Sequence, residues 1–326
     1  MTVKETTTST EKVKIKWFNP ANVLRFFFSG FAMGSAEIVP GVSGGTIAFI
    51  LGIYEKLIVS IKVVTGDAVK LLFQRKFKEM LLVIPWEFLV PLALGMFAAV
   101  FALANLMDYL LVEYPTFVWS FFFGLVLASI FLISRRVSVW KIKTVGVLLL
   151  SALISWLLMG LVPGQTPATL PAFFIAGVIA ICAMILPGVS GSFLLLMMGK
   201  YQQLLAAVTN ADYVILLVFM AGAVLGLSVF SRILSWLFKN YENLVIASLI
   251  GLMLGSLRKL WPFKETVETT VDRHGEVIPL VTVNFLPTEI SSEVVVAVVL
   301  CAVGIGLIIL LNYFAPDVAE AHSEPQ

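Results

Sequence analysis

Long apolar segments alternate with short polar ones over nearly the whole chain. A membrane-spanning helix needs roughly 20 consecutive apolar residues, and several segments reach that length, for example 84–106 and 293–313. The pattern therefore predicts an all-α polytopic membrane protein. The apolar segments occur near residues 21–38, 42–61, 84–106, 116–134, 144–162, 171–186, 192–209, 213–237, 243–257 and 293–313.

Composition supports this fold class. Hydrophobic residues make up 60% of the 326-residue chain and charged residues 13%, and the mean hydropathy is +1.00. Soluble domains contain about half apolar and about a quarter charged residues. A soluble domain is therefore excluded. The net charge of +2 is too small to indicate a function, but the positions of the charged residues along the chain are informative.

The most informative feature is a motif that occurs twice inside apolar sequence. The sequence PGVSGGT at Pro40–Thr46 returns as PGVSGS at Pro187–Ser192, 147 residues later. Each copy is followed by an apolar run that ends in Gly-x-Tyr, at Gly52–Tyr54 and at Gly199–Tyr201. A Pro/Gly break at corresponding positions of two halves points to the binding site of a membrane transporter.

The segments around each motif are too short to cross a bilayer. Residues 171–186 form a run of sixteen, about 24 Å of helix at 1.5 Å per residue, whereas the hydrocarbon core is about 30 Å thick. We interpret the two arms around each motif as a re-entrant helical hairpin with the Pro-Gly motif at its tip. Irregular backbone at membrane depth is tolerated only where protein buries it or where it lines a wet cavity.

The similarity between the two halves continues beyond the motifs. Gly124 and Ser129 recur as Gly251 and Ser256 at an offset of 127 residues, and a polar insertion at 62–83 explains the change from 147 to 127. Each half then contains a re-entrant hairpin followed by three transmembrane helices. The expected organisation is a disordered cytoplasmic tail at 1–19, a first membrane repeat at 20–162, a second at 163–313 and a C-terminal tail at 314–326.

Lys and Arg residues predict the orientation. They cluster in the N-terminal segment, in 62–80 and in 135–143, whereas 107–115 and 163–170 contain none. Excess positive charge marks the cytoplasmic side, which places both termini in the cytoplasm and makes the two hairpins enter from opposite faces. Because each half crosses the membrane an odd number of times, the two repeats have inverted topology.

One group of basic residues does not fit this orientation, because it falls on the predicted outer side. The group belongs to or borders the segment 262–291, which also carries Asp and Glu. The Val/Thr-rich stretches of this segment, on either side of His274 and Gly275, predict a small extramembrane β-hairpin. The four basic residues are Arg258, Lys259, Lys264 and Arg273.

The motif is suited to turning the chain and starting a helix. Proline ends the incoming arm, glycine permits left-handed backbone angles, and Ser43 or Ser190 can cap the next helix. Amides without a partner at a helix start bind anions, so two tips meeting near the midplane would offer converging N–H and hydroxyl donors. The candidate substrate-binding residues are Arg25, Glu37, Pro40, Gly41, Ser43, Gly44, Gly45, Thr46, Pro187, Gly188, Ser190, Gly191, Ser192 and Lys200.

The motif glycines also have a simpler interpretation, in which they only let helices pack closely. We assign that packing role to three GxxxG pairs outside the motifs, Gly30/Gly34, Gly222/Gly226 and Gly251/Gly255. For the duplicated motif, the retained hydroxyl groups favour an anion or substrate site.

Three charged residues lie close to the motifs. Glu37 precedes Pro40 by three residues, and a carboxylate inside an apolar arm is costly and a functional candidate. It could take up a proton during transport, pair with Arg25 or cap the hairpin tip, and its counterpart in the second copy is Met184. Arg25 either meets a phosphate or flanks the membrane, and Lys200 could attract an anion near the outer headgroups.

Catalysis is not expected. The two histidines, His274 and His322, lie in a polar loop and in the tail. No Ser/His/acid set, metal-ligand spacing or Walker loop is recognisable. We therefore expect no cofactor, no metal and no nucleic-acid partner. Transport would then depend on a gradient of a coupling ion, a proton or sodium, or on removal of the substrate.

The segments Gly34–Thr46 (GSAEIVPGVSGGT) and Leu186–Ser192 (LPGVSGS) resemble the bacterial polyprenyl-phosphate transporter family, over about residues 20–313. The resemblance implies a multi-pass protein of the bacterial cytoplasmic membrane. It implies a flippase that returns undecaprenyl phosphate, the carrier lipid of cell-envelope synthesis, from the outer to the inner leaflet. It places the substrate site on the two motifs and Glu37, and alternating access around a midplane phosphate site is the expected mechanism.

Three other functions remain open at this point. A secondary transporter or channel for a small soluble anion would share the pocket but would need a polar path to both faces. A membrane enzyme acting on phospholipid or polyprenyl substrates lacks the expected His and Asp groups. A structural or assembly scaffold would tolerate substitutions in both motifs without any loss of lipid transport.

Overall fold

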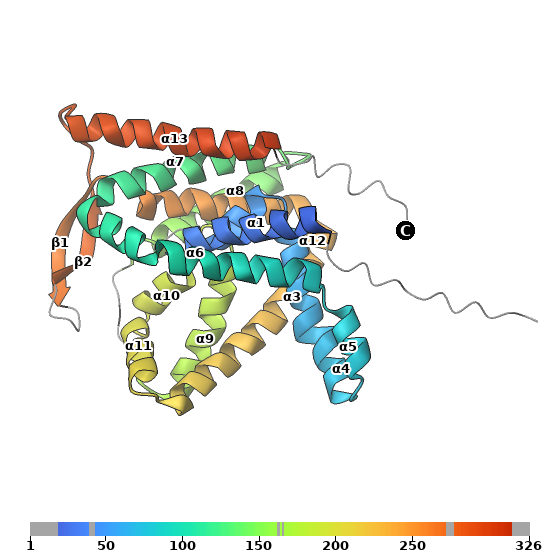
Figure 1. Ribbon diagram of the computed structural model, residues 1–326. Helices are drawn as coiled ribbons and strands as arrows, with labels where there is room; N and C mark the ends of the chain where they lie inside the picture. Colours follow the sequence, from blue (N-terminus) through green and yellow to red (C-terminus); the bar gives the residue numbers. More distant parts are fainter. Residues whose placement is uncertain (1–18, 39–42, 162–163, 165, 272–276, 315–326) are drawn as a thin grey trace, which may run out of the picture.

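A computed structural model describes residues 19–38, 43–161, 164, 166–271 and 277–314 (Figure 1). It is mostly helical. Four helices within these residues are long and apolar enough to cross a membrane, as expected for a polytopic membrane protein. They are α6 (Trp86–Glu113), α7 (Pro115–Ser134), α12 (Tyr213–Leu260) and α13 (Ser292–Phe314).

Two of the predicted segments, 213–237 and 243–257, form the single long helix α12. Its backbone is broken at Tyr241, where φ is −140° and ψ is 40°, so α12 consists of two helical parts joined at a kink. The predicted segment 144–162 becomes α8 (Ile142–Leu158), which packs along α12.

Three helices surround each motif in the same order, and the two that follow each motif have matching lengths. The first set is α1 (Pro20–Ile38), α2 (Gly44–Ile50) and α3 (Tyr54–Lys62), and the second is α9 (Leu170–Ile185), α10 (Gly191–Met197) and α11 (Tyr201–Thr209). Helices α2 and α10 have 7 residues each, and α3 and α11 have 9 each. Gly52 and Gly199 have φ values of 69° and 65°, a left-handed conformation that glycine adopts without steric cost.

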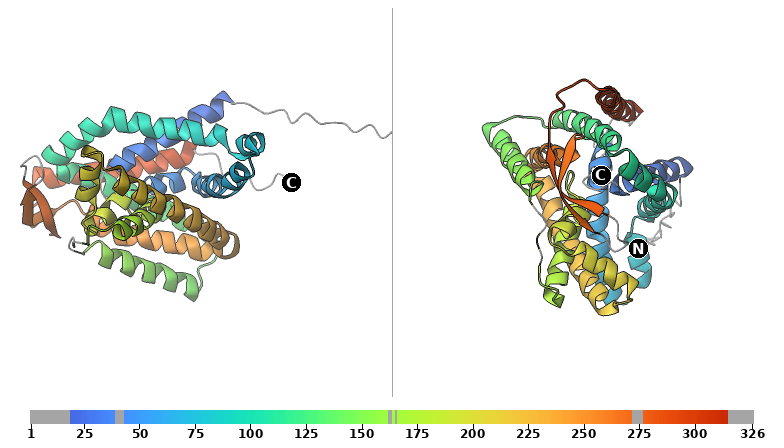
Figure 2. Two further views of the ribbon diagram at one scale, coloured as in Figure 1. Left: turned by 90° about the horizontal axis from the view of Figure 1, so that it is seen from below. Right: turned by 90° about the vertical axis from the view of Figure 1, so that its left-hand side faces the viewer.

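The insertion at 62–83 is helical. It consists of the π-helix η1 (Val63–Ala68), α4 (Val69–Phe73) and α5 (Phe77–Val83). Helices α4 and α5 project from one end of the bundle, away from the β-hairpin at the other end (Figures 1 and 2).

Glycines at repeat-related positions make matching close contacts in the two halves. A Cβ atom added to Gly30 of α1 would lie 2.0 Å from the Leu92 carbonyl oxygen of α6, and one added to Gly177 of α9 would lie 2.2 Å from the Phe219 carbonyl oxygen of α12. Gly177 follows Gly30 by 147 residues and Phe219 follows Leu92 by 127. These are the two offsets found in the sequence.

A second pair of close contacts joins one half to the other. Gly124 of α7 packs against the backbone of Cys301 in α13, and Gly251 of α12 packs against the backbone of Leu148 in α8. Helix α13 of the second half therefore lies on α7 of the first half, and α8 of the first half lies on α12 of the second half. The packing role predicted for the GxxxG pairs is confirmed, since Gly30, Gly34, Gly222, Gly226, Gly251 and Gly255 all face neighbouring helices at close range.

Helix α2 occupies the centre of the molecule. All seven of its residues are buried, and it contacts α1, α3, α7 and α9. Burial of such an apolar element on all sides indicates a core position rather than a lipid-facing one. The first motif is thereby fixed between elements of both halves.

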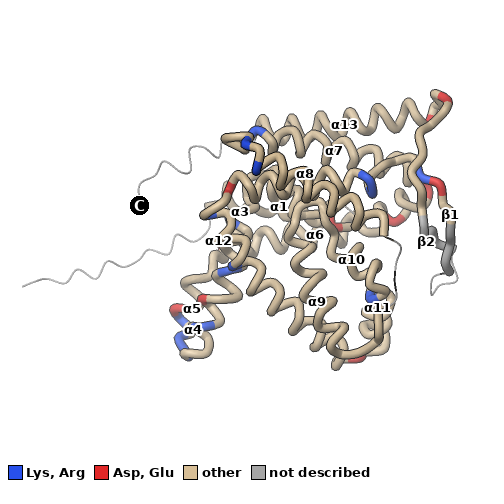
Figure 3. Tube along the Cα trace, turned by 180° about the vertical axis from the view of Figure 1, so that it is seen from behind, with Lys and Arg blue, Asp and Glu red and all other residues tan. Residues whose placement is uncertain are grey.

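A two-stranded antiparallel sheet caps one end of the long helices. Strand β1 (Lys264–Val271) pairs with β2 (Val277–Asn284), with Lys264 opposite Asn284. The β-hairpin predicted within 262–291 is confirmed, although His274 and Gly275 lie outside the described residues. Lys and Arg gather mainly toward the two ends of the long helices and on α4 and α5 (Figure 3).

Candidate functional site

The two copies of the motif meet in the fold. The Gly188 N–H donates a hydrogen bond of 3.0 Å to Thr46 Oγ1, across 142 residues of sequence. Ser43 Oγ donates to the Leu186 carbonyl oxygen at 3.3 Å. A Cβ atom added to Gly45 would lie 2.6 Å from the Ile185 carbonyl oxygen. Glycine at this position therefore allows the first motif to approach the backbone of the second.

The first motif starts a helix in the way that the sequence predicts. Ser43 is the N-cap of α2, and its Oγ accepts a hydrogen bond from the Gly45 N–H at 3.1 Å. Glu37 Oε1 accepts from the Gly44 N–H at 2.7 Å. The prediction of free amides at this tip is therefore wrong, because the protein supplies its own carboxylate and hydroxyl to them.

The second motif differs from the first at its helix start. Ser190 caps α10 by accepting from the Phe193 N–H at 3.4 Å, and its Oγ lies 2.8 Å from Ser192 Oγ. Met184 stands at the position equivalent to Glu37, so no carboxylate reaches this tip from its own arm. No acceptor for the Gly191 or Ser192 amide is found within the described part of the chain.

Backbone conformation explains the glycine that follows the second proline. Gly188 has φ of +82°, and a Cβ atom on it would lie 2.8 Å from the Met253 Cα of α12. A left-handed turn pressed against a helix backbone has room only for glycine. Pro187 is buried in this turn, whereas Pro40 and Gly41 of the first copy lie outside the described residues.

The motif hydroxyls are closed off from solvent in this conformation. Ser43 and Thr46 are each 1% exposed and Ser190 is 3% exposed. Their hydrogen bonds run to neighbouring protein groups rather than to an open cavity. The structure thus brings the two motifs together in a closed arrangement.

Two of the predicted site residues lie apart from the motifs. Arg25 is exposed at the other end of α1 from Glu37, so the suggested Arg25–Glu37 pair is wrong, and the Glu37 carboxylate caps α2 instead. Lys200 is only 1% exposed, and its Nζ donates to the Pro167 carbonyl oxygen at 2.6 Å and to Gln203 Oε1 at 2.9 Å. Lys200 ties the chain before α9 to α11, and its donors are already used.

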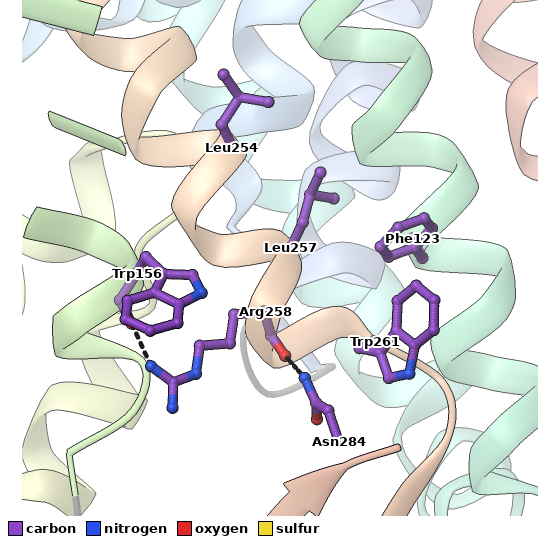
Figure 4. A pocket seen from close by; sticks show the side chains of 7 residues that line it. All are labelled: Phe123, Trp156, Leu254, Leu257, Arg258, Trp261 and Asn284. Atoms are coloured by element: carbon purple, nitrogen blue, oxygen red, sulfur yellow. Dashed lines mark hydrogen bonds between the residues drawn. The ribbon is translucent and has the colours of Figure 1, made fainter. Parts of the chain in front are cut away.

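A separate cavity of about 310 Å³ lies beside the C-terminal end of α12 (Figure 4). Arg258 leans on one wall, where its guanidinium carbon lies 4.1 Å from the Trp156 ring centroid and its Nη1 donates to the Trp156 carbonyl oxygen at 3.0 Å. The other walls come mainly from α7, α12 and β2. The lining residues are Phe123, Trp156, Leu254, Leu257, Arg258, Trp261 and Asn284.

The sequence pattern assigns no role to the basic residues at this end of the molecule, which are an exception to the charge rule. Their position on the predicted outer side, where the charge rule expects few Lys and Arg residues, was the one indication in the sequence that they have a role. In the structure, Lys259 and Lys264 come close together beside the helix that follows the second motif. No spacing rule in the sequence predicts this arrangement, because it brings together the end of α12, strand β1 and the distant helix α10.

Comparisons with known proteins agree with the family resemblance. A family model described as undecaprenyl phosphate translocase-like matches residues 33–278. A polyprenyl-phosphate transporter of Vibrio cholerae is 41% identical over 300 residues, covering 90% of this chain and 97% of that relative. A polyprenyl-phosphate transporter of Staphylococcus aureus is 33% identical over 270 residues, covering 76% and 87%. No solved structure matches the chain. With most of both chains aligned and with the motif-bearing residues inside the matched range, the protein belongs to the undecaprenyl phosphate translocase-like family.

Proposed function

We propose that this protein transports a polyprenyl phosphate, with undecaprenyl phosphate as the substrate, from the outer to the inner leaflet of the bacterial cytoplasmic membrane. The names of the two relatives support the substrate class. The four helices able to cross a bilayer support a membrane location. Both termini would be cytoplasmic, in line with the distribution of Lys and Arg in the sequence.

The headgroup site that we propose lies where the two motifs meet. A phosphate is too costly to move through hydrocarbon without polar partners, and the motifs place hydroxyl and amide donors from both halves at one point. The hydrogen bond between Gly188 and Thr46 is the observation that carries this proposal. The hydroxyls available to the phosphate are those of Ser43, Thr46, Ser190 and Ser192.

Substrate passage in this account requires the motifs to separate. The observed arrangement is closed, with Thr46 and Ser43 bonded to the second motif. We propose that each motif is the tip of a re-entrant hairpin and that the halves are inverted repeats, which rock about the site and open it to one face at a time. The polyprenyl tail would stay in the lipid while the phosphate crosses.

The two tips contribute unequally to this mechanism. At the first tip the Glu37 carboxylate already occupies the Gly44 amide, whereas the Gly191 and Ser192 amides of the second tip keep no protein acceptor among the described residues. The phosphate would therefore bind first at the second tip. Coupling to a proton gradient would act through Glu37, or through the phosphate, whose second pKa is about 6.

Leaflet exchange in liposomes tests the proposed function. Purified protein is reconstituted with undecaprenyl phosphate, and a membrane-impermeant phosphate-binding reagent reports the lipid in the outer leaflet, with and without a pH or sodium gradient. Exchange faster than in protein-free liposomes supports transport. Exchange no faster than in protein-free liposomes under every gradient contradicts the proposed transport function. Inhibition by inorganic phosphate with no dependence on chain length would favour a soluble anion as the substrate.

A further inference from the structure

Two lysines lie next to each other at the junction of α12 and β1, where the side chain of one bonds to the backbone of the other. Lys264 Nζ donates a hydrogen bond to the Lys259 carbonyl oxygen and lies 4.0 Å from the Trp119 ring centroid. Lys259 Nζ lies 5.4 Å from the Phe193 ring centroid. Both side chains are half-buried. Within the described residues, neither ammonium group forms an ion pair with a carboxylate.

Two half-buried ammonium groups, unpaired within the described residues, favour an anionic partner. Partial burial of a charged group costs free energy unless it is paired, and two neighbouring cations repel each other. Burial first, and then the charge of Lys259, lowers the pKa of Lys264 to about 7. Contacts with aromatic rings offset part of the cost, but they do not neutralise the charge. An anion bound near both ammonium groups would relieve both the burial cost and the repulsion.

The lysine pair lies beside the second motif. Phe193, under the Lys259 ammonium, is in the first turn of α10, which begins directly after Ser190. Phe193 also belongs to the small apolar cluster that contains Val189 of the motif. An anion held by the lysine pair would therefore lie next to the helix start whose amides have no protein acceptor among the described residues.

We propose that Lys259 and Lys264 form a capture site for the phosphate monoester of a long-chain lipid, on the β-hairpin side of the membrane. The inference rests on the proposed transport function and adds a first binding step to it. The aromatic rings of Trp119 and Phe193 flank the site and suit a headgroup that carries an apolar chain. From the lysine pair the phosphate passes to the second motif.

Arg258 provides a matched control for charge. It is the residue before Lys259, yet its guanidinium stacks on Trp156 and lines the cavity of Figure 4. It points to α8, whereas Lys259 points to α10. Arg258→Met removes one positive charge from the same end of α12 without touching the lysine pair.

Equilibrium binding to the purified full-length chain in nanodiscs tests the proposal. The probes are undecaprenyl phosphate, undecaprenol and inorganic phosphate. Loss of one charge-assisted contact corresponds to about a ten- to hundredfold weaker binding, expected for Lys259→Met and for Lys264→Met with undecaprenyl phosphate. Arg258→Met should stay within about threefold of wild type, and Lys259→Arg should retain most of the affinity because it keeps the charge.

A readout on the unaltered chain avoids any effect of substitution on folding. Undecaprenyl phosphate should slow the modification of Lys259 and Lys264 by an amine-reactive reagent at pH 8, while undecaprenol should not. Exposed Lys70 serves as the internal control. Equal labelling with and without undecaprenyl phosphate overturns the proposal, and so does protection by inorganic phosphate as strong as that by the lipid.

The outcomes separate this inference from the function on which it rests. If wild type binds and exchanges undecaprenyl phosphate while the lysine variants behave like Arg258→Met, the capture site is wrong and the transport function stands. If wild type neither binds nor exchanges the lipid, the transport function itself is contradicted, and the capture site with it.

Discussion

Thr46 and Gly188 are separated by 142 residues, yet the Gly188 N–H donates a 3.0 Å hydrogen bond to Thr46 Oγ1. Thr46 is the last residue of the first motif, and Gly188 is the second residue of the other. Because the bond is buried, neither partner can exchange it for water unless the motifs move apart. The duplicated sequence therefore forms one structural unit rather than two separate turns.

Replacing Thr46 by valine tests the contribution of this bond. Valine keeps the shape of threonine but leaves the buried Gly188 N–H without an acceptor, which costs about 1–3 kcal/mol of unfolding free energy. Thr46→Ser keeps the hydroxyl and should lose clearly less. Unfolding in detergent, followed by circular dichroism, measures the difference. Equal stability of the valine and serine variants would show that the bond contributes little.

Gly188 and Gly146 should respond in opposite ways to alanine. At Gly188, φ is +82° and an added Cβ would meet Met253 at 2.8 Å, so alanine should destabilise the protein by more than about 1 kcal/mol. At Gly146, in helix α8, an added Cβ meets no atom within 4 Å, and alanine should stabilise the helix by up to about 1 kcal/mol. Thermal unfolding of both variants checks the prediction. Similar midpoints would contradict the strained, crowded turn at Gly188.

Substitutions of Glu37 separate its capping role from a role in proton coupling. Glutamine keeps an oxygen acceptor for the Gly44 N–H, whereas alanine removes it and should cost about 0.5–2 kcal/mol of stability. If Glu37 also carries the coupling proton, Glu37→Gln should fold like wild type but transport at a rate that no longer responds to an imposed pH gradient. A glutamine variant with an unchanged response would leave Glu37 as a cap alone.

The lowered pKa of Lys264 predicts how stability depends on pH. The unfolded chain holds the Lys264 proton up to its ordinary pKa of 10.5, whereas the folded protein releases it near 7. Between these values the unfolded state binds more protons, so this lysine makes stability rise with increasing pH. Lys259 is the charged residue that faces Lys264 in the described structure.

Thermal unfolding midpoints at pH 7 and pH 10 measure this effect. Lys264→Met should flatten the rise relative to wild type, and Lys70→Met, which removes an exposed charge, serves as the control. An identical rise in wild type and Lys264→Met would show that Lys264 does not lose its proton on folding.

Much of the architecture could be predicted from the sequence because it depends on local patterns. The length of apolar segments predicts the long helices, and the GxxxG spacing predicts the close helix packing at Gly30, Gly222 and Gly251. Ser43 and Ser190 cap their helices as the motif suggests. Such features depend on neighbouring residues or on exact repetition.

The remaining features depend on how neighbouring elements are placed in three dimensions, which no spacing rule reveals. The Glu37 carboxylate, near the end of α1, accepts from the Gly44 N–H at the start of α2, whereas the sequence alone also allowed a pair with Arg25. Lys200 is buried because α11 folds back on the segment before α9. Lys264 reaches the Lys259 carbonyl because the chain leaves α12 and enters β1 between these two residues.

The measurement that most directly tests the central claim is leaflet exchange of undecaprenyl phosphate by a Ser190→Ala/Ser192→Ala variant. The two hydroxyls bond to each other at 2.8 Å, so their joint removal leaves neither of them without its partner. Loss of the Ser190 cap on the Phe193 N–H should cost about 1 kcal/mol, so circular dichroism first checks that the double variant is folded. Ser129→Ala removes a buried hydroxyl that bonds within its own helix and serves as the control. We expect exchange to be at least about tenfold slower in the double variant, which corresponds to the loss of one hydrogen bond to the charged phosphate. Ser129→Ala should exchange the lipid at the wild-type rate. Exchange at the wild-type rate by the folded double variant would contradict a phosphate site between the motifs.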